Sequence, residues 1–218
     1  EAVRVVNPKC RFVHVSSNIV YGNSNHYRAS KLMAEELVCT YTQAYNLNTV
    51  ILRYSNVYGA GMPWSDSICL AAMRRSKHEN GYITLSGDGI QARDFTHVTD
   101  IVAGTIKAIH SPYGLNCEQV EPIDLCTGQL TTMNTMARYF DCPIKYSAPR
   151  YGDTHTIKQN PYHAKRLLGW ESTIAVPDGI QDVLGDVPDH YLLGQNNVQY
   201  NAVDPIPQEQ GQERGVAQ

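Results

Sequence analysis

Residues 11–31 read RFVHVSSNIVYGNSNHYRASK and join a strand-like run to a candidate helix. The stretch opens with an apolar run from Phe12 to Val15 that is typical of a strand, and a pair of serines follows. Ten residues after Ser17 stands Tyr27, and Lys31 follows four positions later. A helix over 27–45 places the phenol and the ammonium on one face, about one turn apart. A cation held near a phenol favours the phenolate, so the pair is a candidate general acid and base.

Strand-like runs and helical patterns alternate along the rest of the chain. We expect strands near 11–15, 49–54, 82–85, 122–126 and 143–146, and helices near 27–45, 66–78, 99–110, 131–140, 161–168 and 177–184. Such alternation predicts an α/β fold with a parallel sheet and crossover helices.

Further motifs follow the first one in a fixed order. The run Val50–Tyr54 leads into Ser-Asn-Val-Tyr-Gly at 55–59, then come GDGIQARDFT at 87–96 and Arg-Tyr-Gly-Asp at 150–153. Together these motifs resemble the extended short-chain dehydrogenase/reductase family, in its nucleotide-sugar epimerase/dehydratase branch, and the resemblance extends from residue 1 to about residue 185. It implies the C-terminal part of a doubly wound Rossmann-type parallel sheet with a smaller α/β substrate-binding domain.

The resemblance also implies a domain division. Residues 1–59 would complete the dinucleotide-binding domain, and residues 60–186 would form the substrate-binding region, with about 100–130 packing back on the Rossmann sheet. Residues 187–218 are rich in Gln and Asn with two prolines, so we expect a disordered tail or a docking arm.

The family's catalytic roles fall on three residues by resemblance. Tyr27 matches the proton-transfer tyrosine, and Lys31 matches the lysine that assists it and contacts the nicotinamide ribose of NAD. Ser17 matches the hydroxyl that shares the substrate proton. Tyr54 falls where the family's backbone passes the nicotinamide, which makes Tyr27, Lys31 and Tyr54 the expected cofactor contacts.

Four further residues match positions that bind the nucleotide-sugar substrate. Asn56 matches an amide that bonds the substrate diphosphate, and Arg93 and Arg150 match two arginines that clamp it. A guanidinium suits this role because it offers a fixed fork to phosphate oxygens. Asp153 matches a carboxylate that accepts from the nucleotide ribose or orients the second arginine. Taken alone, the arginines would be surface residues and Asn56 a turn residue.

The positions after Ser17 bear on the reaction. Dehydratases of the family carry Asp-Glu where this chain has Asn18 and Ile19, which cannot exchange a proton. Elimination is therefore disfavoured, and the leading hypothesis is an NAD-dependent nucleotide-sugar epimerase. Two alternatives remain open: a catalytically inactive relic that acts as a binding or structural subunit, and a nucleotide-sugar ketoreductase.

Two departures from the family pattern shape these expectations. No G-x-G-x-x-G run is found, so we expect a truncated or split form that binds NAD weakly or not at all when isolated. Such a form would need a separate N-terminal Rossmann fragment and would be a homo- or hetero-oligomer. The connection from Gly22 to Tyr27 is also short, and it would leave the sugar pocket more open.

Composition narrows the remaining choices. The 218 residues carry a net charge of −3, which gives no general attraction to nucleic acid or anionic membranes. Six cysteines form no C-x-x-C pair, so we expect free thiols, no metal site and a cytoplasmic location. No run reaches the ~18 apolar residues that a membrane span needs.

Overall fold

A computed structural model describes residues 1–62, 69–114, 120–150 and 154–184. Residues 1–185 form one compact unit, and the second unit, 186–218, lies outside the described residues. The predictions made for the tail and for Asp153 therefore fall outside the part of the chain that the structure describes.

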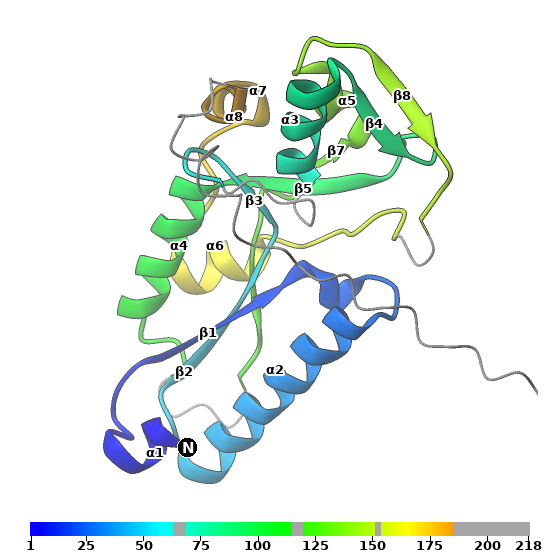
Figure 1. Ribbon diagram of the computed structural model, residues 1–218. Helices are drawn as coiled ribbons and strands as arrows, with labels where there is room; N and C mark the ends of the chain where they lie inside the picture. Colours follow the sequence, from blue (N-terminus) through cyan, green and yellow to red (C-terminus); the bar gives the residue numbers. More distant parts are fainter. Residues whose placement is uncertain (63–68, 115–119, 151–153, 185–218) are drawn as a thin grey trace, which may run out of the picture. The chain divides into compact units, whose positions relative to one another are not determined.

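The unit contains a three-stranded parallel sheet. Its strand order is β1 (Phe12–Ser17), β2 (Thr49–Tyr54) and β6 (Ile123–Leu125). Helix α2 (His26–Tyr45) connects β1 to β2, and Figure 1 places it on the opposite side of these strands from α4 (Val98–His110) and α6 (Tyr162–Leu168). Helices on both faces are the usual environment of a parallel sheet, because crossovers must cover it.

The side chains of β2 alternate between the two faces of the sheet. Val50 and Leu52 are fully buried in a core cluster with residues of α4 and α6. Thr49 and Arg53 point the other way, where they bond Thr42 and Glu35 of α2. Successive side chains of a strand point to opposite faces, so one central strand serves both layers.

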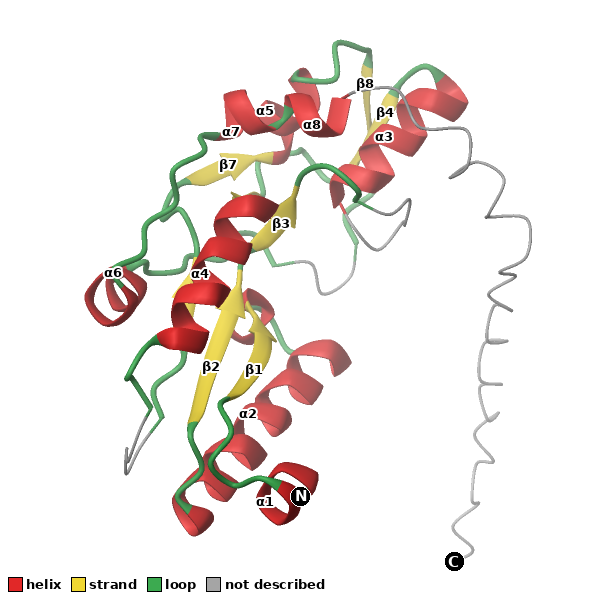
Figure 2. Ribbon diagram, turned by 90° about the vertical axis from the view of Figure 1, so that its left-hand side faces the viewer, coloured by secondary structure: helices red, strands yellow, loops and turns green. Residues whose placement is uncertain are grey.

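The rest of the unit is built from shorter strands. β5 (Ala92–His97) pairs with β3 (Asn56–Tyr58) in parallel and with β7 (Leu130–Thr132) in antiparallel fashion, while β4 (Ile83–Ser86) pairs with β8 (Ile144–Ser147). The helices here are α3 (Cys69–Asn80), α5 (Met133–Arg138), α7 (Val176–Gly179) and α8 (Gln181–Leu184), shown in Figure 2. A second core cluster includes Tyr58, Phe95, Met136 and Phe140.

The predicted α/β fold with a parallel sheet is confirmed, and the five predicted strands are all present within a few residues. The prediction was wrong in two details. The expected helix over 131–140 is shorter because residues 130–132 pair with β5, and the expected helix over 177–184 is divided into α7 and α8. Strands β3, β5 and β7 were missed. The division at residue 59 stays a prediction.

Two short elements complete the description. Helix α1 (Ala2–Val6) precedes β1, and a 3₁₀ turn, η1 (Asn18–Tyr21), follows it. Within the described ranges, no helix has the length and hydropathy that crossing a membrane requires. The five cysteines in those ranges are free thiols, and the same ranges hold no cluster of His, Cys, Asp and Glu suited to a metal ion.

Candidate functional site

The start of α2 holds Tyr27 and Lys31. Asn25 caps the helix, since its side chain accepts a hydrogen bond from Arg28 N at 2.8 Å. The short connection after Gly22 thus suffices to begin the helix at His26. Lys31 Nζ lies 5.7 Å from the centroid of the Tyr27 ring and donates to the Val15 carbonyl at 3.2 Å. Tyr27 is 54% exposed, so its phenol is accessible to a ligand.

Ser17 ends β1 and caps η1. Its Oγ accepts from Ile19 N at 3.3 Å and lies 3.4 Å from Asn18 Oδ1. Asn18 is buried, and its Nδ2 has no hydrogen-bond partner among the described residues. Lys31 therefore contacts the last residues of β1, because it bonds the carbonyl of Val15, and Ser17 ends the same strand.

Tyr54 is the register partner of Ser17 in the neighbouring strand. Its ring packs against the core cluster under α4, and its hydroxyl lies 2.6 Å from Thr105 Oγ1. The side chain of Tyr54 is thus committed to the fold. A cofactor contact at this position would fall to its backbone, as the resemblance implies.

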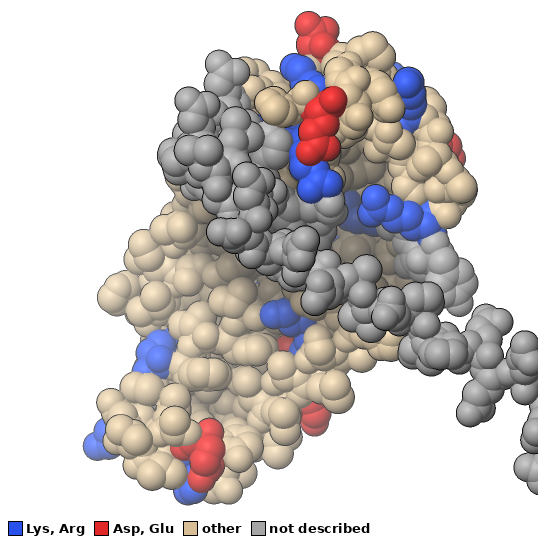
Figure 3. Space-filling view, viewed as in Figure 1, with Lys and Arg blue, Asp and Glu red and all other residues tan. Residues whose placement is uncertain are grey.

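Asn56, Arg93 and Arg150 line one pocket of about 190 Å³. They come from β3, from β5 and from the segment after β8, so the fold brings together positions that lie far apart in the sequence. None of the described residues that line this pocket is Asp or Glu. Figure 3 shows several Lys and Arg side chains in the upper part of the view, where β4 and β8 lie, with Asp or Glu side chains between some of them.

The pocket residues are held by the backbone around them. Arg93 donates from Nη1 to the carbonyls of Ala92 at 2.9 Å and His155 at 3.2 Å. Asn56 Nδ2 donates to the Asp94 carbonyl at 3.0 Å, and Arg150 N donates to Ser86 Oγ at 3.0 Å. Two guanidinium groups in one pocket without a lining carboxylate favour an anion with several oxygens.

Sequence reasoning missed two polar neighbours of this pocket. Ser86 and Gln91 line it together with Arg150, and both also line an adjoining pocket of about 230 Å³. Gln91 Nε2 bonds the Ser86 carbonyl at 2.8 Å, which joins the two ends of the turn between β4 and β5. The signal in the sequence was their position on either side of Gly87 and Gly89.

The catalytic and substrate groups are linked through β2. Ser17 and Tyr54 end adjacent parallel strands, and Asn56 follows Tyr54 by two residues. The carboxyl ends of parallel strands are where open α/β sheets bind their ligands. The site therefore has the expected place in the fold, while the roles assigned to its residues remain predictions.

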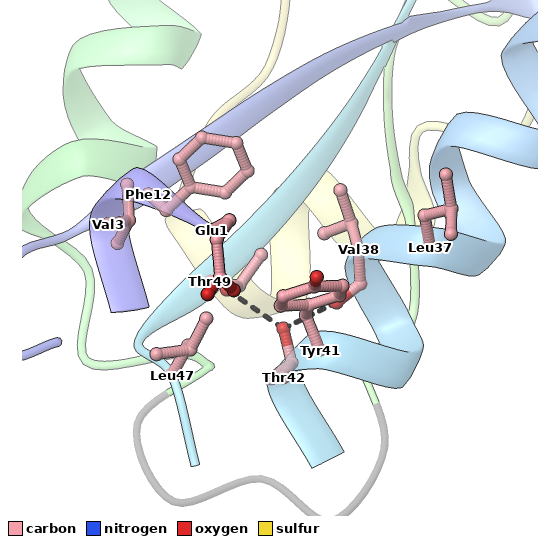
Figure 4. Close-up of a pocket in the computed structure, with 9 residues that line it drawn as sticks. All are labelled: Glu1, Val3, Phe12, Leu37, Val38, Tyr41, Thr42, Leu47 and Thr49. Carbon is pink, nitrogen blue, oxygen red and sulfur yellow. Dashed lines mark hydrogen bonds between the residues drawn. The ribbon is translucent and has the colours of Figure 1, made fainter. Parts of the chain in front are cut away.

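A different pocket lies at the other end of the strands. It holds about 350 Å³ and includes Phe12 and Thr49, the first residues of β1 and β2 (Figure 4). Its walls are mostly apolar, with Leu37 and Val38 from α2, and its lining contains no Lys or Arg. It cannot offer a cation to a phosphate group, so it is not the candidate substrate site.

The residues present fit one end of NAD. The exposed Tyr27 phenol and the Lys31 ammonium are suitable donors for a ribose beside a nicotinamide. The stretch from Gly87 to Ala92 formally fits a looser G-x-G-x-x-A pattern, but it joins strands β4 and β5 instead of opening a helix. The described residues thus offer no Gly-rich helix start for the pyrophosphate.

Comparison with known proteins defines the family. The model of the NAD dependent epimerase/dehydratase family matches residues 1–121, which is more than half of the chain. The chain therefore belongs to this family, and the predicted resemblance is confirmed.

Individual relatives agree with that assignment. The chain is 32% identical over 163 residues to a UDP-glucuronate 4-epimerase of Thermodesulfobacterium geofontis, covering 71% of this chain and 48% of that protein. It is 28% identical over 182 residues to a UDP-glucose 4-epimerase of Bacillus subtilis, covering 72% and 52%. The chain thus spans about half the length of these curated relatives.

Solved structures show the same fold. The Bacillus cereus UDP-glucuronic acid 4-epimerase, in complex with UDP-glucuronic acid and NAD, matches with a TM-score of 0.74 at 22% identity. The match covers 88% of this chain and 64% of that one.

Proposed function

We propose that this chain supplies the catalytic and substrate-binding side of an NAD-dependent nucleotide-sugar epimerase. The observation that carries the proposal is that Asn56, Arg93 and Arg150 line one pocket. Asn56 stands two residues after Tyr54, where strand β2 of the parallel sheet ends. A diphosphate suits the two guanidinium groups, and a sugar attached to it could extend toward Tyr27.

In this proposal Tyr27 moves the proton. It accepts the proton of a sugar hydroxyl when hydride leaves the same carbon, and it returns the proton when hydride comes back. Lys31, held beside the Tyr27 ring by the Val15 carbonyl, orients the phenol, and the Ser17 hydroxyl orients the substrate oxygen. NAD, when bound, would take up the hydride and give it back. Asn18 and Ile19 cannot act as an additional acid or base, which supports epimerisation over water elimination.

A partner that provides the rest of the cofactor site is part of the proposal. Among the described strands β1 pairs with β2 alone, so its other edge is open. Val15 on this strand is 40% exposed, although strands of parallel sheets are normally covered on both sides. We propose that a further parallel strand of a nucleotide-binding segment, from the same or another polypeptide, pairs with this edge.

The test is a turnover assay that separates stereochemistry from redox change. The protein, together with a cofactor-binding half, is incubated with NAD and UDP-glucose, UDP-galactose or UDP-glucuronate, and proton NMR follows the sugar while absorbance follows NADH. We expect inversion at one carbon with no net NADH, and loss of inversion in Tyr27→Phe. Net NADH formation would favour the ketoreductase. Binding of UDP-sugars without turnover, even with a cofactor-binding half added, would favour the non-catalytic subunit.

A further inference from the structure

Helix α2 is attached to the sheet by polar contacts. Of its 20 residues two are buried, Glu35 and Thr42, and the Thr42 hydroxyl bonds that of Thr49 at 2.9 Å. A surface helix usually packs through an apolar stripe, but Met33 and Leu37 on α2 are each 62% exposed. The place of α2 on the sheet therefore depends on a few directional contacts.

Glu35 makes the strongest of these contacts. It accepts from Ser16 Oγ at 2.5 Å and from Arg53 twice, at 2.9 Å from Nε and 2.6 Å from Nη2. Both side chains are largely buried, at 7% exposure for Glu35 and 16% for Arg53. A two-pronged bond between a guanidinium and a carboxylate fixes distance and orientation together.

Further hydrogen bonds connect Arg53 on β2 to Tyr21 on η1 and through it to Asp124 on β6. Arg53 Nη1 donates to the Tyr21 hydroxyl at 2.7 Å, and that hydroxyl donates to Asp124 at 3.0 and 3.1 Å. Burial, reinforced by the Asp124 carboxylate, raises the pKa of Tyr21 to about 12, so the phenol keeps the proton that it donates. Asp124 also accepts from Asn160 N at 3.1 Å.

The strand register places Arg53 and Asp124 next to the candidate catalytic residues. Ser16, Arg53 and Asp124 lie opposite one another across β1, β2 and β6, and the next residue on β1 is Ser17. On α2, Glu35 follows Lys31 by four residues and Tyr27 by eight, so the three lie on one face. Tyr21 ends η1, the turn that Ser17 caps.

We propose that Glu35, Arg53, Tyr21 and Asp124, the polar network, position Tyr27 and Lys31 relative to Ser17. The catalytic meaning of this role rests on the proposed function. The four residues do not touch substrate; they act through α2 and η1. Buried ion pairs add little net stability because desolvation offsets their attraction, so the value of this network lies in the geometry it imposes.

Hydrogen exchange on the 218-residue chain tests the proposal without any need for turnover. Glu35→Leu and Arg53→Met should speed exchange of the α2 amides of residues 30–37 by roughly tenfold or more, as loss of a charge-assisted hydrogen bond predicts. Exchange in β4 and β8 should stay unchanged. Glu35→Gln, which keeps an acceptor, should give a smaller effect, and Tyr21→Phe offers a milder variant if the others fold poorly.

The matched control is Lys165→Met, which breaks an ion pair of 2.8 Å between two exposed residues, Lys165 and Glu171. It should leave α2 exchange unchanged. Unchanged α2 exchange in all the network variants, or equal acceleration in β4 and β8, would overturn the positioning role.

Two further readouts separate positioning from general support of the fold. UDP affinity should stay within about twofold in the network variants, because none of the four network residues lines the pocket of Arg93 and Arg150. In the turnover assay kcat should fall at nearly constant KM, and loss of UDP binding would contradict the proposal. If the wild-type protein shows no turnover even with a cofactor-binding half added, the proposed function fails, while the exchange result still decides whether the network holds α2.

Discussion

Replacing Arg93 with Met should weaken the binding of UDP far more than replacing Arg150. Both line the candidate substrate pocket, but Arg93 is partly buried and held by two backbone carbonyls, whereas Arg150 is exposed. Hydrogen bonds to charged groups contribute about 1.5–3 kcal/mol when they are sheltered from solvent. Exposed ion pairs contribute about 0–1 kcal/mol.

These energies give the expected size of each effect. At about 1.4 kcal/mol per factor of ten, Arg93→Met should weaken UDP binding roughly 10- to 100-fold, and Arg150→Met less than about fivefold. Arg138, exposed on α5 and absent from the pocket lining, provides the control, and Arg138→Met should leave the affinity unchanged. This control matches the change in net charge.

Calorimetric titration with UDP, UMP and uridine measures the effect. Affinity should increase with the number of phosphates, and higher salt should reduce the difference, because ions screen charge. Equal affinity of folded Arg93→Met and wild type, or no preference for UDP over uridine, would refute the reasoning.

Three other perturbations have defined outcomes. Tyr27→Phe should lower turnover of an active complex by ~10²–10⁴-fold with little change in substrate affinity, and near-normal rates would remove Tyr27 from the mechanism. Burial alone would raise the pKa of Glu35, but hydrogen bonds from Arg53 and Ser16 outweigh it and hold the pKa below its ordinary value of 4.5. The stability that Glu35 contributes is therefore present above pH 4.5 and is lost as pH falls through the lowered pKa, so the unfolding free energies of wild type and Glu35→Gln should converge in acid. Gly114→Ala should cost at least about 3 kcal/mol in urea unfolding, because a Cβ would stand 2.1 Å from the Thr49 carbonyl oxygen; Gly81→Ala, with similar positive φ but open space, should cost about 1–2 kcal/mol.

The sequence predicted the elements whose pattern is local. Thr49–Tyr54 forms a strand with the predicted bounds. Its first four residues, Thr-Val-Ile-Leu, are all buried, and such a run can be identified from the local sequence alone. Helix α2 was predicted within one residue, since its 20 residues contain no Gly or Pro and Asn25 caps it.

Elements that depend on distant partners were missed. The stretch ARDFTH at 92–97 contains charged residues, yet it forms a strand in which four consecutive residues are buried. Asp94 tolerates burial because Thr127 and Gly128, from a turn more than thirty residues away, donate to its carboxylate. The sequence around Asp94 contains no pattern that predicts these distant donors.

The candidate site was predictable in part. Asn56, Arg93 and Arg150 stand within motifs, so their identity could be predicted from the sequence, and the structure adds that they line one pocket. The polar network could not be predicted, because Glu35 and Arg53 meet only when α2 lies on the sheet. The spacing of Tyr27, Lys31 and Glu35 at four-residue intervals was the one hint.

We propose that a nucleotide sugar binds between the two arginines with its sugar toward Tyr27. A crystal structure of the protein with UDP-glucose would locate both groups. We expect diphosphate oxygens about 3 Å from the guanidinium nitrogens of Arg93 and Arg150 and the glucose ring directed toward Tyr27 and Ser17. A diphosphate bound elsewhere, or a sugar directed away from Tyr27 into solvent, would contradict the claim.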